Sequence, residues 1–140
     1  MSARHGSAVA RNGRGVLILG ESGAGKSCLV LELLAIGADL VADDAVIVQK
    51  SGPELVLGCP PNIAGMIEAR GVGLLSVNSI DQARLAFVVD LDKTANARLP
   101  PPETVSILGV DVPLIRGKNT PALSAVIWMI LGDGQLLPVE

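Results

Sequence analysis

The chain has 140 residues, a formal net charge of −3 and only two aromatic side chains, Phe87 and Trp128. Its length suits one domain that folds without disulfides or a structural metal. The acidic balance and the lack of a basic stripe argue against nucleic-acid binding, and no apolar run is long enough for a membrane span. The two cysteines have no metal-site or disulfide-framework spacing, so a reducing cytoplasm is the expected compartment.

The beginning of the chain predicts strand, loop and helix. Ser7–Ala10 predicts a short strand, and Arg11–Arg14 a turn, because Asn-Gly tolerates positive φ. Gly15–Leu19 is a short apolar run, typical of a buried strand, that enters a glycine-rich loop. Lys26–Ile36 places its apolar residues on one helical face, and Gly37 is a plausible end for that helix.

The middle of the chain predicts short strands and one short helix. The expected strands are Ala38–Ala42, Ala45–Gln49, Glu54–Leu57, Leu74–Val77 and Leu85–Leu91. Asn62 is expected to cap a short helix, Ile63–Glu68. Arg70–Gly73 is expected to form a loop.

An exposed excursion and two more strands follow. Asp92–Glu103 contains three consecutive prolines, which fits a lid, a docking loop or an ordinary surface loop. Val105–Leu108 and Val112–Ile115 predict short strands, and Arg116–Asn119 a polar loop.

The C-terminal part predicts a last helix and completes the fold class. Thr120 is expected to cap this helix, with Pro121 at its first position, and Gly132-Asp133-Gly134 to end it after Leu131. Together the elements predict an α/β fold with a mixed sheet and a phosphate-binding loop. We expect residues 1–140 to form a single domain.

The clearest motif is a phosphate-binding loop between the strand and the helix. The pattern G-x-x-x-x-G-K-[ST] is matched by Gly20-Glu21-Ser22-Gly23-Ala24-Gly25-Lys26-Ser27. Its glycines let successive N–H groups point into one concavity, and the start of the helix adds its positive dipole end. Lys26 supplies a charge for the outer phosphates, and the Ser27 hydroxyl suits Mg²⁺. The motif therefore predicts ATP and Mg²⁺ as ligands.

Two adjacent carboxylates follow the next expected strand. Asp43 and Asp44 lie about seventeen residues after the loop, where a carboxylate can face the metal and the transferred phosphoryl group. One could bind the metal while the other accepts a proton. Side chains of neighbouring strand residues point to opposite faces, so both reach one site only through a local bend. The plainer alternative is an Asp-Asp turn at the end of a strand.

Four segments together resemble a known family. They are His5-Gly6, Gly25-Lys26-Ser27, Leu40-Val41-Ala42-Asp43-Asp44 and Ile67-Glu68-Ala69-Arg70-Gly71-Val72-Gly73. In this order and spacing they resemble the catalytic domain of HPr kinase/phosphorylase, in the short form found in some proteobacteria. The resemblance covers nearly the whole chain.

The resemblance implies a fold, an activity and partners. The fold would be similar to the nucleotide-binding core of phosphoenolpyruvate carboxykinase. The activity would be ATP- and Mg²⁺-dependent phosphorylation of a seryl residue of HPr, a carrier protein of the phosphotransferase system. Many family members also remove that phosphate with inorganic phosphate and release pyrophosphate. A ring-like homo-oligomer, a hexamer, is implied as well.

The resemblance also implies catalytic residues. Asp43 matches the acidic residue that acts as base in the kinase direction and as acid in the reverse direction, and His5 matches the histidine beside it. Lys26 would bind the phosphates, and Arg70 would lie near the phosphates or the partner protein. Lys118 lies in a second signature loop, at a position where the family usually has an arginine.

The implied metal ligands are Ser27, Asp44 and Glu68. The residues alone permit plainer alternatives at some of these positions. His5 could be a solvated histidine near the terminus, and Glu68 with Arg70 a surface ion pair that contributes little stability.

Two departures from the family pattern keep other functions open. Cys28 stands where the long forms carry an acidic residue, and Lys118 lacks the bidentate fork of an arginine. Both favour an ATP-binding regulator with weak catalysis, whereas the intact Asp43-Asp44 pair favours an enzyme. A small-molecule kinase or carboxykinase-like enzyme with the same core is a third possibility.

Overall fold

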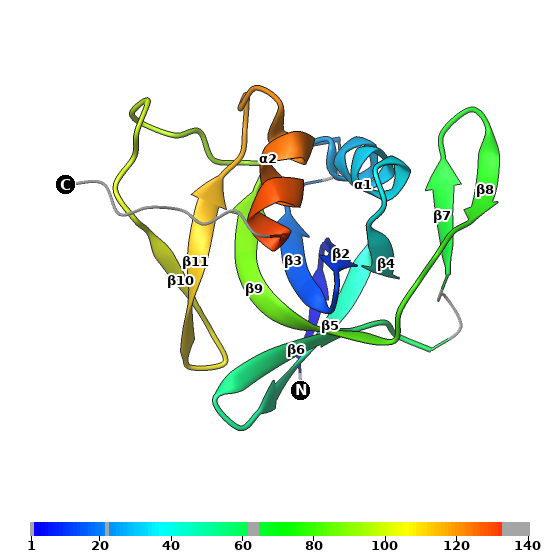
Figure 1. Ribbon diagram of the computed structural model, residues 1–140, viewed down its shortest axis with the longest axis horizontal. Coiled ribbons are helices and arrows are strands. Elements are labelled where there is room, and N and C mark those ends of the chain that lie inside the picture. The colour runs from blue at the N-terminus through cyan, green and yellow to red at the C-terminus, as the bar shows by residue number, and fades with distance from the viewer. Residues whose placement is uncertain (1, 22, 62–64, 133–140) are drawn as a thin grey trace.

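A curved mixed sheet carries two helices on one face, with a small hairpin standing apart (Figure 1). The computed structural model describes residues 2–21, 23–61 and 65–132. Its elements are β1 (Ser2–His5), β2 (Ser7–Arg11), β3 (Arg14–Leu19), α1 (Lys26–Ala35), β4 (Asp39–Ala42), β5 (Ala45–Ser51), β6 (Glu54–Gly58), β7 (Met66–Ala69), β8 (Gly73–Ser76), β9 (Gln82–Asp90), β10 (Thr104–Ile107), β11 (Val110–Arg116) and α2 (Leu123–Leu131). Neither helix is long and apolar enough to cross a membrane, among the residues described.

The centre of the sheet is parallel and its flanks are antiparallel. The strand order is β1-β5-β6-β9-β3-β2-β4, and β11, paired with β10, also joins β9. Strands β3 and β11 run parallel to β9, so Leu19 and Arg116 are both Cα partners of Asp90. The carboxyl ends of three parallel strands therefore meet at one edge, which is where α/β folds commonly bind ligands. The mixed sheet expected from the sequence is confirmed.

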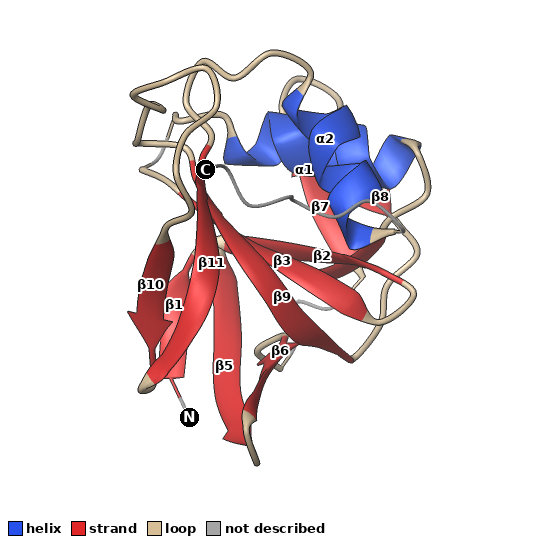
Figure 2. Cartoon of the chain, turned by 60° about the vertical axis from the view of Figure 1, so that its left-hand side comes forward, coloured by secondary structure: helices blue, strands red, loops and turns tan. Residues whose placement is uncertain are grey.

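Both faces of the central strands are buried. Val16 and Ile18 of β3 pack with apolar residues of α1 and α2. Leu17, which points the other way, packs inside the curve of the sheet with Val46 and Leu57. This alternation follows from the two-residue period of a strand. Figure 2 shows both helices on the same side of the sheet.

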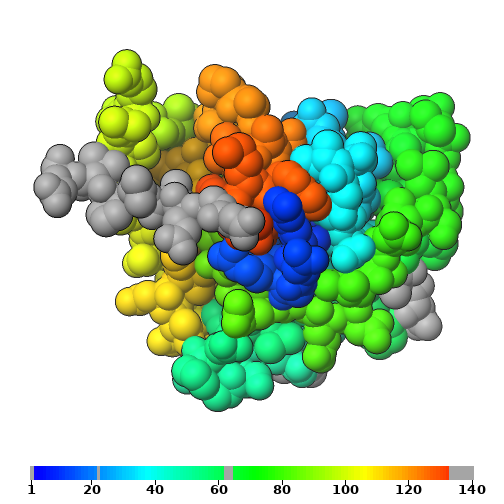
Figure 3. All heavy atoms as spheres, in the orientation of Figure 1, coloured from blue at the N-terminus to red at the C-terminus, as the bar shows by residue number. Residues whose placement is uncertain are grey.

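The turn between β2 and β3 holds the C-terminal end of α2. The Arg14 guanidinium donates to the carbonyls of Ile130, Leu131 and Gly132 at 2.9, 3.1 and 3.1 Å. Arg11 donates to the Trp128 carbonyl at 2.9 Å and lies 4.1 Å from the centre of its ring. Positive charge is favourable at this end of a helix. Figure 3 shows the blue N-terminal part of the chain against the orange α2.

The structure contradicts the predicted helix Ile63–Glu68. Residues 66–69 form β7, which pairs antiparallel with β8. Ile67 and Ala69 are buried and Glu68 is exposed, a two-residue period that suits a strand. Gly71 and Gly73, at φ of 83° and 137°, turn the chain between the two strands. Asn62 and the start of the predicted helix lie outside the described residues.

The start of the last helix also differs from the prediction. The helix begins at Leu123, after Ala122 in a left-handed conformation with φ of 52°, and no side chain caps it. Thr120 instead donates its hydroxyl to the Arg116 carbonyl at 3.3 Å. The predicted cap and the predicted first position at Pro121 are therefore wrong. Gly132 ends the helix as expected, and Asp133 and Gly134 lie outside the described residues.

Other expectations differ less. Strand β1 was not predicted from the sequence. It pairs with β5 and brings His5 opposite Ala45. The excursion between β9 and β10 is largely exposed, as expected. Arg116, expected in a polar loop, is the last residue of β11.

Candidate active site

The glycine-rich loop joins β3 to α1, and three of its described residues have positive φ. Gly20, Gly23 and Gly25 have φ of 157°, 88° and 98°. A side chain at Gly23 or Gly25 would meet no atom within 4 Å, so backbone conformation and not crowding calls for glycine at these two positions. Gly25 precedes α1, and no described side chain caps this end of the helix. Its first N–H groups are therefore free to bind an anion. Ser22 lies outside the described residues.

Lys26 and Asp92 hold this loop in shape. Lys26 is only 8% exposed, and its ammonium donates to the carbonyls of Gly20 and Glu21. The Asp92 carboxylate accepts the Glu21 N–H, with oxygens at 3.0 and 3.2 Å. Asp92 follows β9, so it ties the loop to the neighbouring parallel strand.

The two aspartates share one site because the chain bends between β4 and β5. Asp44 adopts a left-handed conformation with φ of 68°, and the Ala45 N–H donates to the Asp43 carbonyl at 2.8 Å. In a regular strand the two side chains would point apart. Here both line the same cavity, through the local bend that the sequence analysis required.

Two residues at the junction of β1 and β2 support these aspartates. Ser7, which is 1% exposed, donates its hydroxyl to Asp43 Oδ1 at 2.8 Å. His5 Nδ1 lies 3.6 Å from Asp44 Oδ1. The resemblance placed His5 beside Asp43; in the structure the carboxylate within 4.0 Å of its ring is that of Asp44.

Gly6 allows this close arrangement. A Cβ on Gly6 would lie 2.8 Å from the Ile18 carbonyl oxygen, so the backbone of β3 leaves no room for a side chain at this position. The Gly6 N–H donates to the Asp44 carbonyl at 3.2 Å. The sequence analysis missed Ser7; its place two residues after His5 was the only available signal.

One cavity of about 630 Å³ brings together Gly23 and Gly25 of the predicted loop and seven further predicted site residues. Four separate segments of the chain supply them: His5, Lys26, Ser27, Asp43, Asp44, Glu68 and Arg70. Ser7 and Cys28 also line this cavity. Its volume lies within the range of about 300–1,000 Å³ that small-molecule sites usually have, so the cavity is large enough for a phosphorylated ligand.

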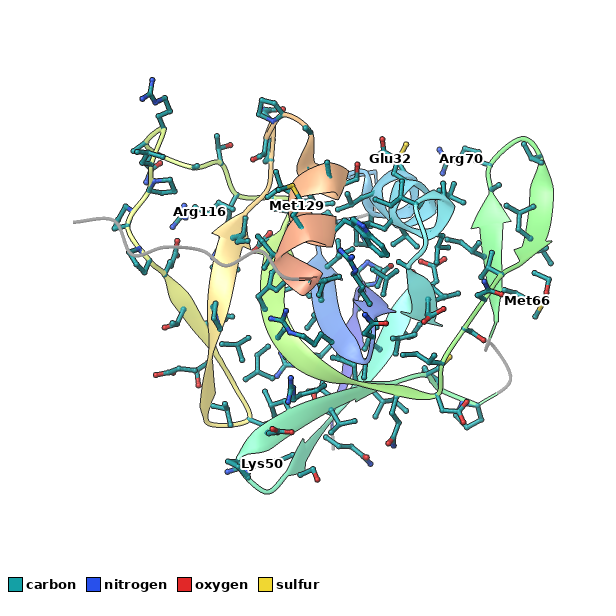
Figure 4. The ribbon with its side chains drawn as sticks, viewed as in Figure 1. Glu32, Lys50, Met66, Arg70, Arg116 and Met129 are labelled. Carbon is teal, nitrogen blue, oxygen red and sulfur yellow. The ribbon has the colours of Figure 1, made fainter. Side chains whose placement is uncertain are left out.

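Glu68 and Arg70 reach the cavity from the hairpin β7–β8. The buried Ile67 belongs to the same core cluster as Leu33 of α1. The hairpin therefore packs beside the helix through this cluster, while Glu68 and Arg70 are exposed. Figure 4 shows Arg70 on the side of the hairpin that faces α1.

Lys118 is the predicted catalytic residue that does not line this cavity. It lines a second cavity of about 370 Å³ on the other side of the loop, with Glu21, Ala24 and Asn119. Gly23 lines both cavities. The loop is therefore the wall between them.

Shifted pKa values lie outside the main cavity. The hydrogen-bonded Arg116 guanidinium lowers the pKa of the Glu103 carboxyl below its ordinary value, and Glu103 raises the pKa of Arg116 in return. Their two hydrogen bonds, 2.8 and 3.1 Å long, fix the end of the excursion to β11. Burial raises the pKa of the Cys59 thiol. No group of three His, Cys, Asp or Glu side chains suited to a metal ion occurs in the described ranges.

Comparisons with known proteins agree with the resemblance seen in the sequence. Residues 1–129 match the model of the HPr Serine kinase C-terminal domain. The HPr kinase/phosphorylase of Nitrosomonas europaea is 37% identical, over 86% of this chain and 43% of that protein. The HPr kinase/phosphorylase of Burkholderia lata is 40% identical, over 77% of this chain and 37% of that protein.

A solved structure supports the same conclusion for the fold. The Hpr(Ser) kinase/phosphatase from Coxiella burnetii superposes with a TM-score of 0.82 and 27% identity, over 95% of both chains. The chain spans less than half the length of the curated relatives named above.

Proposed function

Because the chain belongs to the HPr serine kinase C-terminal domain family, we propose that it is an ATP- and Mg²⁺-dependent kinase for a seryl residue of an HPr-like carrier protein. The observation that carries the proposal is the convergence of Lys26, Asp43, Asp44, Glu68 and Arg70 in one cavity. Residues 1–140 would act as one catalytic domain with a nucleotide-binding core like that of phosphoenolpyruvate carboxykinase.

The loop Gly20–Ser27 would hold the phosphates of ATP. Its three glycines with positive φ shape a concave backbone, and the uncapped start of α1 presents N–H donors toward it. The buried ammonium of Lys26 supplies a positive charge that is already positioned by loop carbonyls. Fixed donors of this kind neutralise the charge of a transferring phosphoryl group.

Ser27, Asp44 and Glu68 are the proposed ligands of Mg²⁺. All three line the cavity with Lys26, and they are the oxygen donors that this ion prefers. Mg²⁺ is usually held by one or two carboxylates and by substrate phosphates. When bound, it would withdraw negative charge from the phosphate oxygens.

Asp43 is the proposed base. Its carboxylate would accept the hydroxyl proton of the substrate serine as the serine oxygen bonds to the γ-phosphorus and ADP leaves. The Ser7 hydroxyl holds one carboxylate oxygen at 2.8 Å, which leaves the other oxygen for the incoming hydroxyl. His5 is a positioning residue in this scheme, because it lies next to Asp44.

The reverse reaction is also part of the proposal. With inorganic phosphate as nucleophile and pyrophosphate as product, Asp43 would return the proton to the serine oxygen. Arg70, at the rim of the cavity on the hairpin, is placed to contact the phosphates or the carrier protein.

The experiment that tests the proposal is transfer of label from γ-labelled ATP to HPr of the same cell, with Mg²⁺. The control is an HPr whose acceptor serine is replaced by alanine. We expect label on the normal carrier alone, and loss of that label when inorganic phosphate is added. ATP binding without transfer would favour a regulatory protein. Label on a metabolite in the absence of protein substrate would favour a small-molecule kinase.

The assembly is a separate proposal. The family resemblance implies a ring-like homo-oligomer, which light scattering of the purified chain would measure directly. A monomer at the concentrations of the transfer assay would contradict it.

A further inference from the structure

The end of β9 is bonded to the start of the phosphate-binding loop. The Leu91 N–H donates to the Leu19 carbonyl at 2.8 Å, which continues the parallel pairing of β3 and β9. The Asp92 N–H donates to Asp90 Oδ1 at 2.9 Å. An aspartate side chain that accepts the N–H two residues later fixes a local turn. The backbone that carries the Asp92 carboxylate is therefore held in place beside the loop.

One peptide unit of this loop is held at both of its polar groups. The Glu21 N–H donates to the Asp92 carboxylate, whose oxygens lie at 3.0 and 3.2 Å. The carbonyl of the same peptide unit belongs to Gly20, and it accepts the Lys26 ammonium. Because a planar trans peptide directs its C=O and its N–H to opposite sides, Asp92 and Lys26 bond to opposite sides of this unit.

The two hydrogen bonds strengthen each other. A carboxylate that accepts the N–H of a peptide unit polarises it, so the carbonyl of that unit becomes a better acceptor. The Lys26 ammonium depends on such acceptors, because it is only 8% exposed and a buried charge without partners is costly. Asp92 therefore stabilises the position of Lys26, although Asp92 itself is exposed and lines the second cavity, on the other side of the loop.

We propose that Asp92 is a positioning residue of the phosphate-binding loop, which fixes the Gly20–Glu21 peptide unit and, through it, the Lys26 ammonium. The inference rests on the proposed function, in which Lys26 meets the phosphates of ATP. Asp92 acts through the loop and not on the phosphates. The charge of a carboxylate near an anion site disfavours the anion, so the favourable contribution of Asp92 comes from its hydrogen bond.

The first test separates the hydrogen bond of Asp92 from its charge. Asp92→Asn keeps an oxygen that can accept the Glu21 N–H and removes the charge, whereas Asp92→Ala removes both. ATP with Mg²⁺ is titrated calorimetrically into each variant of the full chain. Asp111→Asn and Asp111→Ala, at an exposed position of β11, are the matched controls.

We expect Asp92→Ala to weaken ATP binding about two- to tenfold, the range of one lost hydrogen bond, and Asp92→Asn to restore most of that loss. Wild-type affinity in Asp92→Ala, or tighter binding in both variants, would overturn the inference. Equal losses in both would also overturn it, because the loss would then follow the charge.

The second test measures whether Asp92 acts through Lys26. Initial rates of label transfer from a low concentration of ATP are compared for Asp92→Ala, Lys26→Ala and the double variant. Coupled residues have non-additive effects, so the double variant should be no slower than Lys26→Ala alone. Losses that multiply would show that Asp92 acts independently of Lys26 and would overturn the inference. A wild-type protein that binds no ATP would overturn the proposed function together with the inference.

Discussion

The two helices pack side by side on one face of the sheet. The N-terminal end of α1 and the C-terminal end of α2 differ in whether side chains bond to their main-chain groups. The N-terminal end of α1 follows Gly25 and has no side-chain cap among the described residues. The C-terminal end of α2 has its carbonyls bonded to Arg11 and Arg14. An end without partners can bind a ligand, whereas an end satisfied by side chains stabilises the fold. Substitutions at the two ends should therefore separate activity from stability.

The largest effect on activity is expected from a substitution in the main cavity, which the first residues of α1 help to line. Asp43→Asn keeps the size of the side chain but cannot accept a proton, so transfer to HPr should fall about 10²–10⁴-fold. ATP binding should stay largely intact, because the loop supplies it. Initial rates of label transfer and ATP titration measure the two quantities. Asp111→Asn, at an exposed position of β11, is the control, and near-normal transfer by the Asp43 variant would mean that another group is the base.

Lys26→Ala should affect binding and transfer together. The variant removes the ammonium that closes the loop, and loss of one such charge-stabilising group typically costs about 10²–10³ in rate. Circular dichroism would confirm that the fold is retained. Lys50→Ala is the matched loss of a lysine. Unchanged turnover with Lys26→Ala would remove this loop from the mechanism.

Arg14→Ala should lower the stability of the fold and leave ATP binding unchanged. Three carbonyls at the end of α2 lose a charged donor, so the free energy of unfolding should fall by about 1.5–3 kcal/mol. ATP affinity should not change. Arg84→Ala, which removes an exposed ion pair with Glu54 at 3.6 Å, should cost only about 0–1 kcal/mol. Urea unfolding measures both, and loss of ATP binding in the Arg14 variant would break the distinction between the helix ends.

The sequence predicted the helices and strands that depend on residues close together along the chain. The apolar run before Gly20, the amphipathic face after Lys26 and the strand pattern of Leu85–Leu91 each carry their own periodicity, and the corresponding elements are confirmed. The residues of the main cavity were found through segments with fixed spacing. Their roles in binding and catalysis remain predictions.

What the sequence could not predict depends on contacts between distant segments. The residues around Arg14 do not indicate that its guanidinium bonds to the end of a helix 116 residues later. Likewise, the residues around Ser7 do not indicate that its hydroxyl donates to Asp43, which is 36 residues away. The segment Met66–Ala69 forms a strand because it pairs with β8 and buries Ile67. The second cavity, with Lys118, exists only once three strand ends come together.

Ser7→Ala tests one of these distant contacts. It leaves Asp43 in place but removes the donor at 2.8 Å, so the carboxylate loses its orientation. Transfer should fall about tenfold, the rate equivalent of one hydrogen bond to a charged group, with ATP affinity unchanged. Ser106→Ala, on the exposed side of β10, is the control. A loss as large as that of Asp43→Asn would instead show that Ser7 takes part in proton transfer itself.

The smallest effect is expected at Glu103, which belongs to neither helix end. Since Arg116 lowers its pKa in the folded state, the unfolded chain binds a proton more readily. The stabilisation is therefore complete above the ordinary pKa of 4.5 and is lost as the pH falls through the lower folded value. Glu103→Gln should be slightly less stable than wild type at neutral pH, and the urea midpoints should converge in acid. A difference in urea midpoint between Glu103→Gln and wild type that grew in acid would contradict this sign. A loss of stability larger than that of Arg14→Ala would show that the excursion stabilises the fold more than the end of α2 does.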